Sequence, residues 1–394
     1  MKTVYLDNNA TTRPAPEVIE AMTPYLAELW GNPSSMHAFG GQVAKPLAEA
    51  RAQVADFLGA ERPEEVVFNG CATEGDNHAL FGVAAAWGRP GTIITSRVEH
   101  PAILGPCLRL REMGHQVIEI GVDGEGRFDM AAYEAALAAA TGPKLVSVMW
   151  ANNETGVIFP IQEIAEKGKA AGATVHTDAV QAAGKVPLDV RTVPVDLLTI
   201  AGHKMHAPKG IGVLYIRRGT RIKPFVIGGH QERGRRGGTE NVPYIIGLAK
   251  ACELSARALA DGSEARMACL RDKLEAGLLA TCPDSRVNGD RTHRVANTLN
   301  ISFEYIEGES VLYHLSDRGI CASSGSACAA GSLEPSHVIR AMGVPFTAVH
   351  GSIRFSLSRY TTEDEIDYVL KHCPEVVAEM RAISPFVGHA MPKL

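Results

Sequence analysis

Short apolar segments alternate with longer helical patterns through most of this chain, and this alternation constrains its fold more than any other feature. The apolar segments read as strands and lie at residues 65–70, 91–96, 115–122, 144–153, 173–180, 195–202 and 212–219. Helical patterns follow the first four of them, from Thr73, near Pro101, over 130–140 and over 161–171. Strands that alternate with helices in this way predict a mostly parallel sheet covered by helices.

The pattern changes near residue 255, where the alternation stops. Two helical stretches over about 243–281 lead to the strand-like segments "NTLNISFEYI" and "SIRFSLSRY", with a helix near 309–318 between them and a last helix from Thr362. We therefore expect a large domain over 15–254 and a smaller α+β domain made of 1–14 and 255–394. The chain of 394 residues is long enough for both.

Charge and cysteine usage exclude several classes of protein. The formal net charge of −5 argues against nucleic acid or an acidic membrane as the main partner. No apolar run reaches the roughly eighteen residues of a transmembrane helix, and Asp7, Asn8 and Asn9 interrupt any apolar core of a signal peptide. Eight cysteines without a C-x-x-C pair indicate a reducing compartment, so we expect a cytoplasmic protein.

Polar side chains follow five of the predicted strands at the point where each strand ends. They are Thr73, His100, Asn153, Asp178 and Lys204. Ligands of open α/β sheets bind at the carboxyl ends of the strands. We therefore expect all five side chains to face one ligand.

The pairing of Lys204 with Asp178, which lies 26 residues earlier, suggests pyridoxal phosphate. This cofactor needs a lysine for covalent attachment and a carboxylate that keeps its ring nitrogen protonated. Asp178 would be the carboxylate and Lys204 the amine.

Other residues could complete such a site. A phosphate needs backbone N–H groups at a helix start, which Ala72 and Thr73 would offer directly after a strand. His100 is flat enough to stack on the ring, and Asn153 or Gln181 could reach the ring hydroxyl.

Each of these residues also has an ordinary structural interpretation. Lys204 could be a solvated surface lysine, Asp178 and His100 could be helix caps, and Thr73 could be an N-cap. A nucleotide-binding fold is the main rival, although the chain lacks G-x-G-x-x-G after the first strand and a G-K-[ST] loop. A metal site is less consistent with the sequence, because there is no H-E-x-x-H and "CASSGSAC" matches no zinc spacing.

The segment "GICASSGSACAAGSLEPSHVIRAMG" places a thiol where little side-chain bulk could pack it. Cys328 is surrounded by Ala, Ser and Gly, so it is either an accident or a nucleophile on a pliable loop. We expect Cys321 and Cys71 to be packing residues. Pro335 suits the first turn of a new helix.

Motifs spread over essentially the whole chain resemble those of the cysteine desulfurases, which are fold-type I pyridoxal-phosphate enzymes of the class V aminotransferase group. The motifs are "YLDNNATT", "NPSSMHAFG", "VVFNGCATEGDN", "VEHPAIL", "VMWANNETG", "HTDAVQAAGKVPLDV", "AGHKMHAPKGIGVLY", "GGHQERGRRGGTEN", "SSGSAC", "SLEPSHVIRAM" and "GSIRFSLSRYTTEDEID". The resemblance is nearest to the nitrogen-fixation type, with the housekeeping type as its neighbour. It implies an α/β fold with a mostly parallel seven-stranded sheet in the large domain and a smaller α+β domain that carries a catalytic cysteine loop at about 321–333.

The resemblance implies a role for each candidate residue toward the cofactor. Lys204 would bind it covalently and Asp178 would pair with its ring nitrogen, while Asn153 and Gln181 would touch the ring or its hydroxyl. His100 would stack on the ring and act as an acid–base group. The phosphate would be held by residues from three segments, with Thr239 supplied by the second subunit of a homodimer: Ala72, Thr73, Ala201, Gly202, His203 and Thr239. Ala201 departs from the family, which commonly has Ser, Thr or Cys there, so only its backbone could contact the phosphate.

The resemblance also implies the reaction. L-cysteine would become L-alanine while Cys328, as the nucleophile, keeps the sulfur as a persulfide; Arg354 and Asn153 would bind the substrate. The sulfur would pass to an iron–sulfur scaffold protein, with a transient iron–sulfur contact at Cys328, for nitrogenase maturation. A housekeeping iron–sulfur desulfurase, a selenocysteine lyase, an aminotransferase-like enzyme and a non-catalytic cofactor-binding scaffold stay open as alternatives.

Overall fold

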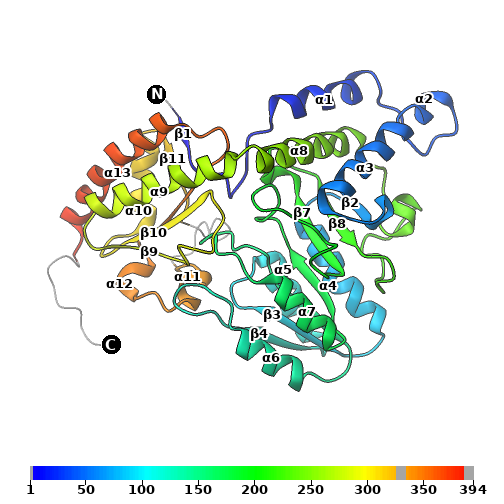
Figure 1. Cartoon of the computed structure of the whole chain (residues 1–394), viewed down its shortest axis with the longest axis horizontal. Helices are drawn as coiled ribbons and strands as arrows, with labels where there is room; N and C mark the ends of the chain where they lie inside the picture. The colour runs from blue at the N-terminus through cyan, green and yellow to red at the C-terminus, as the bar shows by residue number, and fades with distance from the viewer. Residues whose placement is uncertain (1–2, 325–333, 386–394) are drawn as a thin grey trace.

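A computed structural model describes residues 3–324 and 334–385 of the chain (Figure 1). Its largest element is a seven-stranded sheet in the order β2-β8-β7-β6-β5-β3-β4. The strands are β2 (Val66–Asn69), β3 (Thr92–Ser96), β4 (Gln116–Ile120), β5 (Lys144–Ser147), β6 (Thr174–Asp178), β7 (Leu197–Ala201) and β8 (Gly212–Ile216). β8 runs antiparallel to both of its neighbours and the other pairs are parallel, which confirms the mostly parallel sheet.

β5 is shorter than the predicted strand over 144–153. The chain turns back after it, since Ala151 forms a bridge with Ile158 and Gly156 has a φ of +78°. A side chain at position 156 would be strained at that φ, so the glycine permits the reversal. The polar residues after β5 are thereby kept at the sheet edge.

The sheet strands alternate between two apolar layers. Ile93, Leu145, Leu197 and Leu214 pack with one layer of helices, and the residue that follows each of them packs with the opposite layer. The first layer is α4 (Ala72–Trp87) and α5 (Pro101–Glu112); the second contains α6 (Met130–Ala139), α7 (Ile161–Ala170) and α8 (Val242–Ala260). Helices α1 (Pro16–Ala27) and α3 (Ala44–Leu58) pack against α8, and the short α2 (Ala38–Gly41) lies between them in the chain. Successive side chains of each strand are therefore buried on opposite faces, as expected for a sheet that helices cover on both sides.

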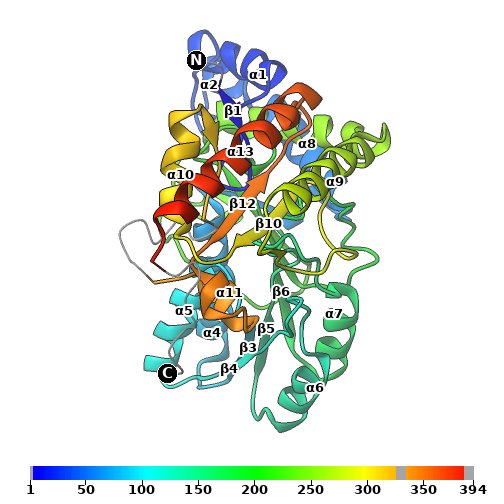
Figure 2. The ribbon, with the colours of Figure 1, turned by 90° about the vertical axis from the view of Figure 1, so that its left-hand side faces the viewer.

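A second, smaller sheet has the order β12-β10-β9 and is antiparallel, and its strands β12 and β10 lie side by side in Figure 2. It consists of β9 (Ser285–Val287), β10 (Thr298–Phe303) and β12 (Ser352–Ser356). Helices α9 (Ser263–Thr281), α10 (Gly308–Asp317) and α13 (Glu363–Ile383) build a separate apolar core with it. Thr362 caps α13 together with Glu365 in a capping box, which is why the last helix begins where the sequence predicts.

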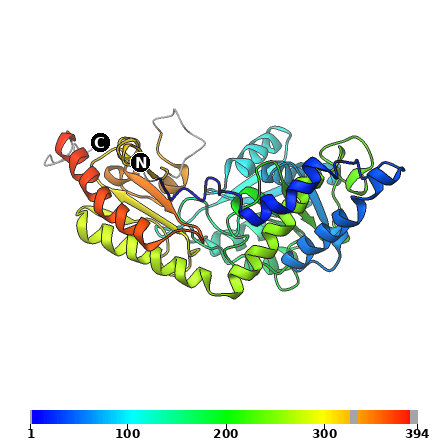
Figure 3. The same ribbon diagram turned by 90° about the horizontal axis from the view of Figure 1, so that it is seen from above.

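The N-terminal arm connects the two cores (Figure 3). β1 (Val4–Tyr5) pairs with β11 (Ile320–Cys321), so Val4 and Leu6 are buried in the smaller core. The arm then reaches the large sheet, where the Thr12 amide donates to the His203 carbonyl. The arm was expected to join the smaller domain, and the domain bounds at 15–254 remain a prediction.

Helices α11 (His337–Ala341) and α12 (Phe346–Val349) pack on the larger core, through Val338 and Ile339 among others. Ser336 is the N-cap of α11, and its hydroxyl accepts from the amides of residues 338 and 339. Pro335 therefore lies before the N-cap and outside the helix, and its prediction as a first-turn residue is wrong. The helix begins after Ser336 because the serine hydroxyl accepts from the amides of the first turn.

Candidate active site

A cavity of about 450 Å³ lies at the carboxyl edge of the large sheet. Such a volume suits a small-molecule ligand or cofactor. Segments at the ends of five strands, β2, β3, β5, β6 and β7, line it, together with the N-terminal arm, His337 of α11 and Arg354 of β12. The lining residues include Asn9, Ala10, Cys71, Ala72, Thr73, Asp76, His100, Asn153, Asp178, Gln181, Ala201, His203, Lys204, His337 and Arg354.

The start of α4 supplies backbone N–H groups to this cavity. Ala72 and Thr73 are its first two residues, and the amides of a first helical turn have no acceptor within the helix. Cys71 is the N-cap, so the interpretation of Thr73 as an N-cap is wrong. Cys71 is also exposed rather than packed, because the extended backbone between β2 and α4 places it at the cavity.

Asp178 ends β6 and is 6% exposed. One of its oxygens accepts from the Val180 amide at 2.9 Å in a turn that starts no helix, so the interpretation of Asp178 as a helix cap is wrong. Burial raises the pKa of Asp178 to about 6, whereas the Val180 hydrogen bond and the nearby Lys204 charge act in the opposite direction. A second carboxyl group, Asp76, lies buried at the same cavity, with His176 Nε2 3.6 Å from its Oδ1. Burial and the charge of Asp178 raise the pKa of Asp76 well above its usual value.

Lys204 follows β7 in a short 3₁₀ turn over Gly202–Lys204. Its ammonium donates to the backbone carbonyls of Asn9 and Ala10 at 2.6 and 2.8 Å. Gly202 is required here, because a Cβ would lie 2.8 Å from Ile211 Cγ2. The predicted solvated surface lysine is therefore wrong, since Lys204 is held against the arm at the cavity.

His203 and Ala201 flank this turn. The His203 ring lies 3.2 Å from the Thr11 hydroxyl, and burial together with the Lys204 charge lowers its pKa to about 4. Ala201 is 1% exposed and presents only a methyl group. Any polar contact from position 201 must therefore come from its backbone.

His100 is the N-cap of α5, as its ordinary interpretation predicted, and it also lines the cavity. Its Nδ1 accepts from the Ala102 amide at 3.1 Å. Burial lowers the pKa of His100 to about 4, and the charges of Lys204 and His337 act in the same direction. At neutral pH the ring is uncharged, and its hydrogen bond places the remaining proton on Nε2.

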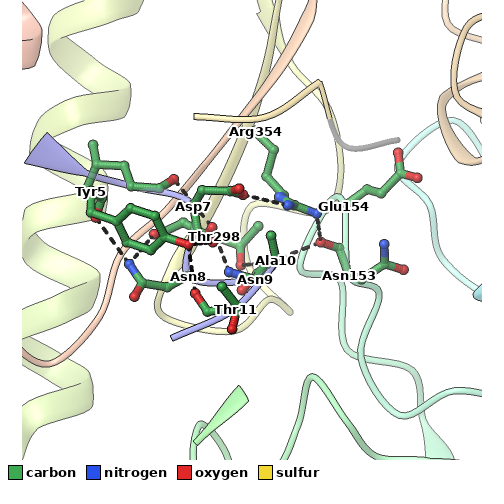
Figure 4. Close-up of polar contacts among 12 residues, drawn as sticks. Tyr5, Asp7, Asn8, Asn9, Ala10, Thr11, Asn153, Glu154, Thr298 and Arg354 are labelled. Carbon is green, nitrogen blue, oxygen red and sulfur yellow. Dashed lines mark hydrogen bonds and ion pairs between the residues drawn. The ribbon is translucent and has the colours of Figure 1, made fainter. Parts of the chain in front are cut away.

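Arg354 reaches the cavity from β12 of the smaller sheet and is 2% exposed (Figure 4). Its guanidinium donates to Asp7 Oδ1 at 2.8 Å and to the Asn153 carbonyl at 2.9 Å. The Asn153 carbonyl also accepts from the Asn9 side chain at 3.2 Å. The arm and the loop after β5 thus hold an arginine fork at the cavity, where it can bind a carboxylate with two parallel hydrogen bonds.

Thr239 is exposed and does not line the cavity of its own chain. Cys328 and the loop around it lie outside the described residues. Within the described residues, no three His, Cys, Asp or Glu side chains are grouped as metal ligands.

No helix in the described part of the chain is both long and apolar enough to cross a membrane.

Sequence reasoning gave no role to several cavity residues, chiefly Asn9, Asp76 and His337. Asn9 lies within the motif "YLDNNATT", but the motif does not distinguish it from Asn8. The fold determines its place, since pairing of the arm with β11 and with Ser356 of β12 brings it across to Lys204. The spacing of the residues around Asp76 does not distinguish it from an ordinary polar residue of the first turns of α4.

The residues present fit pyridoxal phosphate. The cavity combines an amine, a flat neutral imidazole and a helix N-terminus with free amides. The buried carboxyl groups of Asp76 and Asp178 are the strongest structural sign, because a positive charge at the cavity would offset the cost of burying them, and His176, 3.6 Å from Asp76, is uncharged at neutral pH. A protonated heterocycle would supply that charge.

Comparison with known proteins agrees with this arrangement. The chain is 58% identical to cysteine desulfurase 2 of Trichormus variabilis, covering 98% of this chain and 96% of that protein. It is 53% identical to the cysteine desulfurase NifS of Azotobacter vinelandii, covering 98% and 95%. A solved structure of a NifS-like protein superposes with a TM-score of 0.89 at 38% identity, covering 96% of this chain and all 100% of that one. Residues 4–369 match the model of the class V aminotransferases, and the chain therefore belongs to the class V aminotransferase family.

Proposed function

We propose that the chain is a pyridoxal-phosphate-dependent cysteine desulfurase that converts L-cysteine to L-alanine and keeps the sulfur as a persulfide on Cys328. One structural observation carries the proposal: Lys204, Asp178, His100 and Arg354 come from four separate segments and face one cavity. The relatives that are named cysteine desulfurases, at more than half identity over nearly the full chain, support it.

The cofactor would be held by residues that the structure gathers. Lys204 would bind it covalently, and Asp178 would pair with its ring nitrogen. Ala72, Thr73 and His203 would hold the phosphate, together with the backbone at Ala201 and Gly202. When bound, pyridoxal phosphate withdraws electrons from the Cα of an amino acid.

Arg354 would orient the substrate, because its fork binds the carboxylate and Asn153 lies beside it. The tautomer of His100 then divides the acid–base work. Its Nδ1 is engaged with Ala102 and its Nε2 carries the proton, so His100 is a donor at neutral pH. Lys204 is therefore the residue that we expect to remove the Cα proton.

Cys328 would attack the sulfur of the substrate as a thiolate. A sulfur–sulfur bond forms, the carbon–sulfur bond of cysteine breaks, and the electron pair of that bond stays with the carbon, which takes up a proton to become the methyl group of alanine. No external oxidant is needed, because the carbon that keeps the electron pair is reduced while the sulfur is oxidised to the level of a persulfide.

We further propose that the working form is a homodimer in which Thr239 of one subunit completes the phosphate site of the other. Thr239 is exposed, and Ile227 in the same loop region is 87% exposed. Exposed apolar side chains beside an exposed candidate site residue favour a protein partner over solvent.

The sulfur would pass to an iron–sulfur scaffold protein, with a transient iron–sulfur contact at the Cys328 persulfide. We propose nitrogenase maturation as the destination because one close relative carries the name NifS. Housekeeping cluster assembly and selenocysteine lyase activity are the alternatives. The chemistry needs reduced thiols, as in the cytoplasm, and the seven described cysteines are all free.

The decisive experiment compares Cys328→Ala with Cys321→Ala, a matched change at the half-buried cysteine seven positions earlier. Cys328→Ala should keep the visible absorption of the cofactor and form neither alanine nor sulfide from L-cysteine and a reductant. Cys321→Ala should keep both activities. Turnover at the wild-type rate in Cys328→Ala would refute the proposal, and Lys204→Ala should lose the visible band. Catalysis that survives alkylation of all thiols would favour an aminotransferase, and a lack of any turnover would favour a non-catalytic scaffold.

A further inference from the structure

A second lysine, Lys185, is buried beside the site and has no part in the function proposed above. It is 9% exposed, and its Nζ donates to Gln181 Oε1 at 2.5 Å and to Asn9 Oδ1 at 3.0 Å. Both partners line the cavity, whereas Lys185 lies behind them. Lysine is seldom buried to this extent without a purpose, since desolvating its ammonium is costly.

Lys185 decides which end of the Gln181 side chain faces the cavity. A glutamine amide has an acceptor oxygen at one corner and a donor nitrogen at the other. Because the amine of Lys185 is a donor, it binds the oxygen. The Gln181 nitrogen then points the other way and donates to the Asn9 carbonyl at 3.0 Å. That same carbonyl accepts from Lys204, so the donor end of Gln181 lies on the side of the covalent attachment point.

We infer that Lys185 is a positioning residue that fixes the Gln181 amide with its N–H groups, and not its oxygen, toward the ring oxygen of the bound cofactor. The inference rests on the proposed function, in which Gln181 contacts the ring or its hydroxyl. A donor at the ring oxygen stabilises the deprotonated form of the cofactor, and so lowers the pH at which its visible absorption titrates.

The charges around Lys185 are compatible with this role. Burial lowers the pKa of Lys185 to about 7, the positive charges of Lys204 and Arg354 act in the same direction, and Glu264 opposes them. His206 lines the small polar cavity that also contains Lys185 and Glu264. Loss of a proton leaves the amine two N–H donors, which still suffice for Gln181 and Asn9. The orientation of the amide therefore does not depend on the charge of Lys185.

The test measures the pH midpoint of the visible absorption band in the purified, cofactor-loaded protein. Lys185→Met and Gln181→Met should each raise the midpoint by about one pH unit, which corresponds to about 1.4 kcal/mol. The double variant should show no more than the shift of Gln181→Met, because Lys185 acts through Gln181. Lys185→Gln, which keeps an uncharged N–H donor, should restore the wild-type midpoint. Lys144→Met, at a lysine that donates to the Ala171 carbonyl away from the cavity, is the control and should shift nothing.

The outcomes separate this inference from the proposed function. A shift in Gln181→Met without one in Lys185→Met would overturn the role of Lys185 and leave the site as proposed. Unchanged midpoints in both would overturn the ring contact of Gln181 together with the inference. Additive shifts, or a Lys185→Gln midpoint as displaced as that of Lys185→Met, would show a direct effect of charge and overturn positioning. If Lys185→Met does not fold, Lys185→Gln alone decides, since a raised midpoint in it contradicts the inference.

Discussion

Replacing Asp7 by asparagine removes the negative partner of a buried arginine with almost no change of shape. Arg354 is 2% exposed and Asp7 is 21% exposed, and their closest atoms are 2.8 Å apart. Arg354 would keep the Asn153 carbonyl, but its Nε is buried without a partner even in the wild-type protein. The substitution therefore leaves a buried positive charge whose hydrogen-bond acceptors, the Asn153 carbonyl and the new amide oxygen, are both neutral.

The expected cost follows from this burial. Breaking a fully buried ion pair costs about 3–5 kcal/mol, and partial exposure of Asp7 lets water screen the remaining charge, so we expect about 2 kcal/mol. Urea unfolding followed by circular dichroism measures the difference. Asp56→Asn, at an exposed carboxylate on α3, is the control and should stay within about 0.5 kcal/mol.

Kinetics give an independent readout of the same substitution. If Asp7 and Asn153 hold the Arg354 fork for the substrate carboxylate, Asp7→Asn should raise the KM for L-cysteine roughly tenfold and change kcat much less, since the loss is in binding. An unchanged KM with unchanged unfolding would refute the reasoning. A fall in kcat alone would mean that Asp7 acts on the chemical step instead of on the orientation of Arg354.

Three further predictions concern stability. Arg51→Met should cost about 3–5 kcal/mol in urea unfolding, because Glu232, 5% exposed and 2.6 Å away, would be left as a buried unpaired charge. Gly156→Ala should cost about 1–3 kcal/mol, since φ is +78° and the new Cβ would lie 2.8 Å from another side chain; Gly88→Ala, with φ +64° in open space, should cost about 1 kcal/mol. Burial lowers the pKa of His176 to about 3, so the folded protein holds this ring uncharged while the unfolded chain protonates it below about pH 6.5. The contribution of His176 to the free energy of unfolding is therefore complete above pH 6.5 and is lost as the pH falls toward 3. Between pH 7 and 5 the wild-type protein should therefore lose about 2 kcal/mol more than His176→Gln, measured by unfolding at each pH.

The large sheet was predictable because its signal is local. Each strand is a short apolar run bounded by turn residues, and each helix follows with its own period. The strand order was not predictable from such runs, and neither was the reversal of β8, which depends on long-range pairing with β2 and β7. The reversal of the chain after β5 includes Gly156, whose positive φ is visible only in three dimensions.

The site was predictable where the proposed cofactor requires a particular type of residue. A lysine and an aspartate at strand ends indicate a cofactor, and the structure does bring Lys204 and Asp178 to one cavity. The polar network behind them has no such signature. Asn9 has contacts with residues more than 140 positions away, and nothing in its local sequence distinguishes it from its neighbour Asn8.

The N-terminal arm explains why these residues must act together. The backbone oxygen of Asn9 binds Lys204 and Gln181, and its side chain binds Lys185 and, from the smaller sheet, Thr298. Two residues earlier on the arm, Asp7 holds Arg354. A displacement of the smaller sheet would therefore move Arg354, the proposed substrate-binding residue, and the Asn9 carbonyl that contacts Lys204 at the same time, because the arm connects them. Precise placement of the proposed cofactor and of the proposed substrate consequently depends on one short extended segment that spans the two cores.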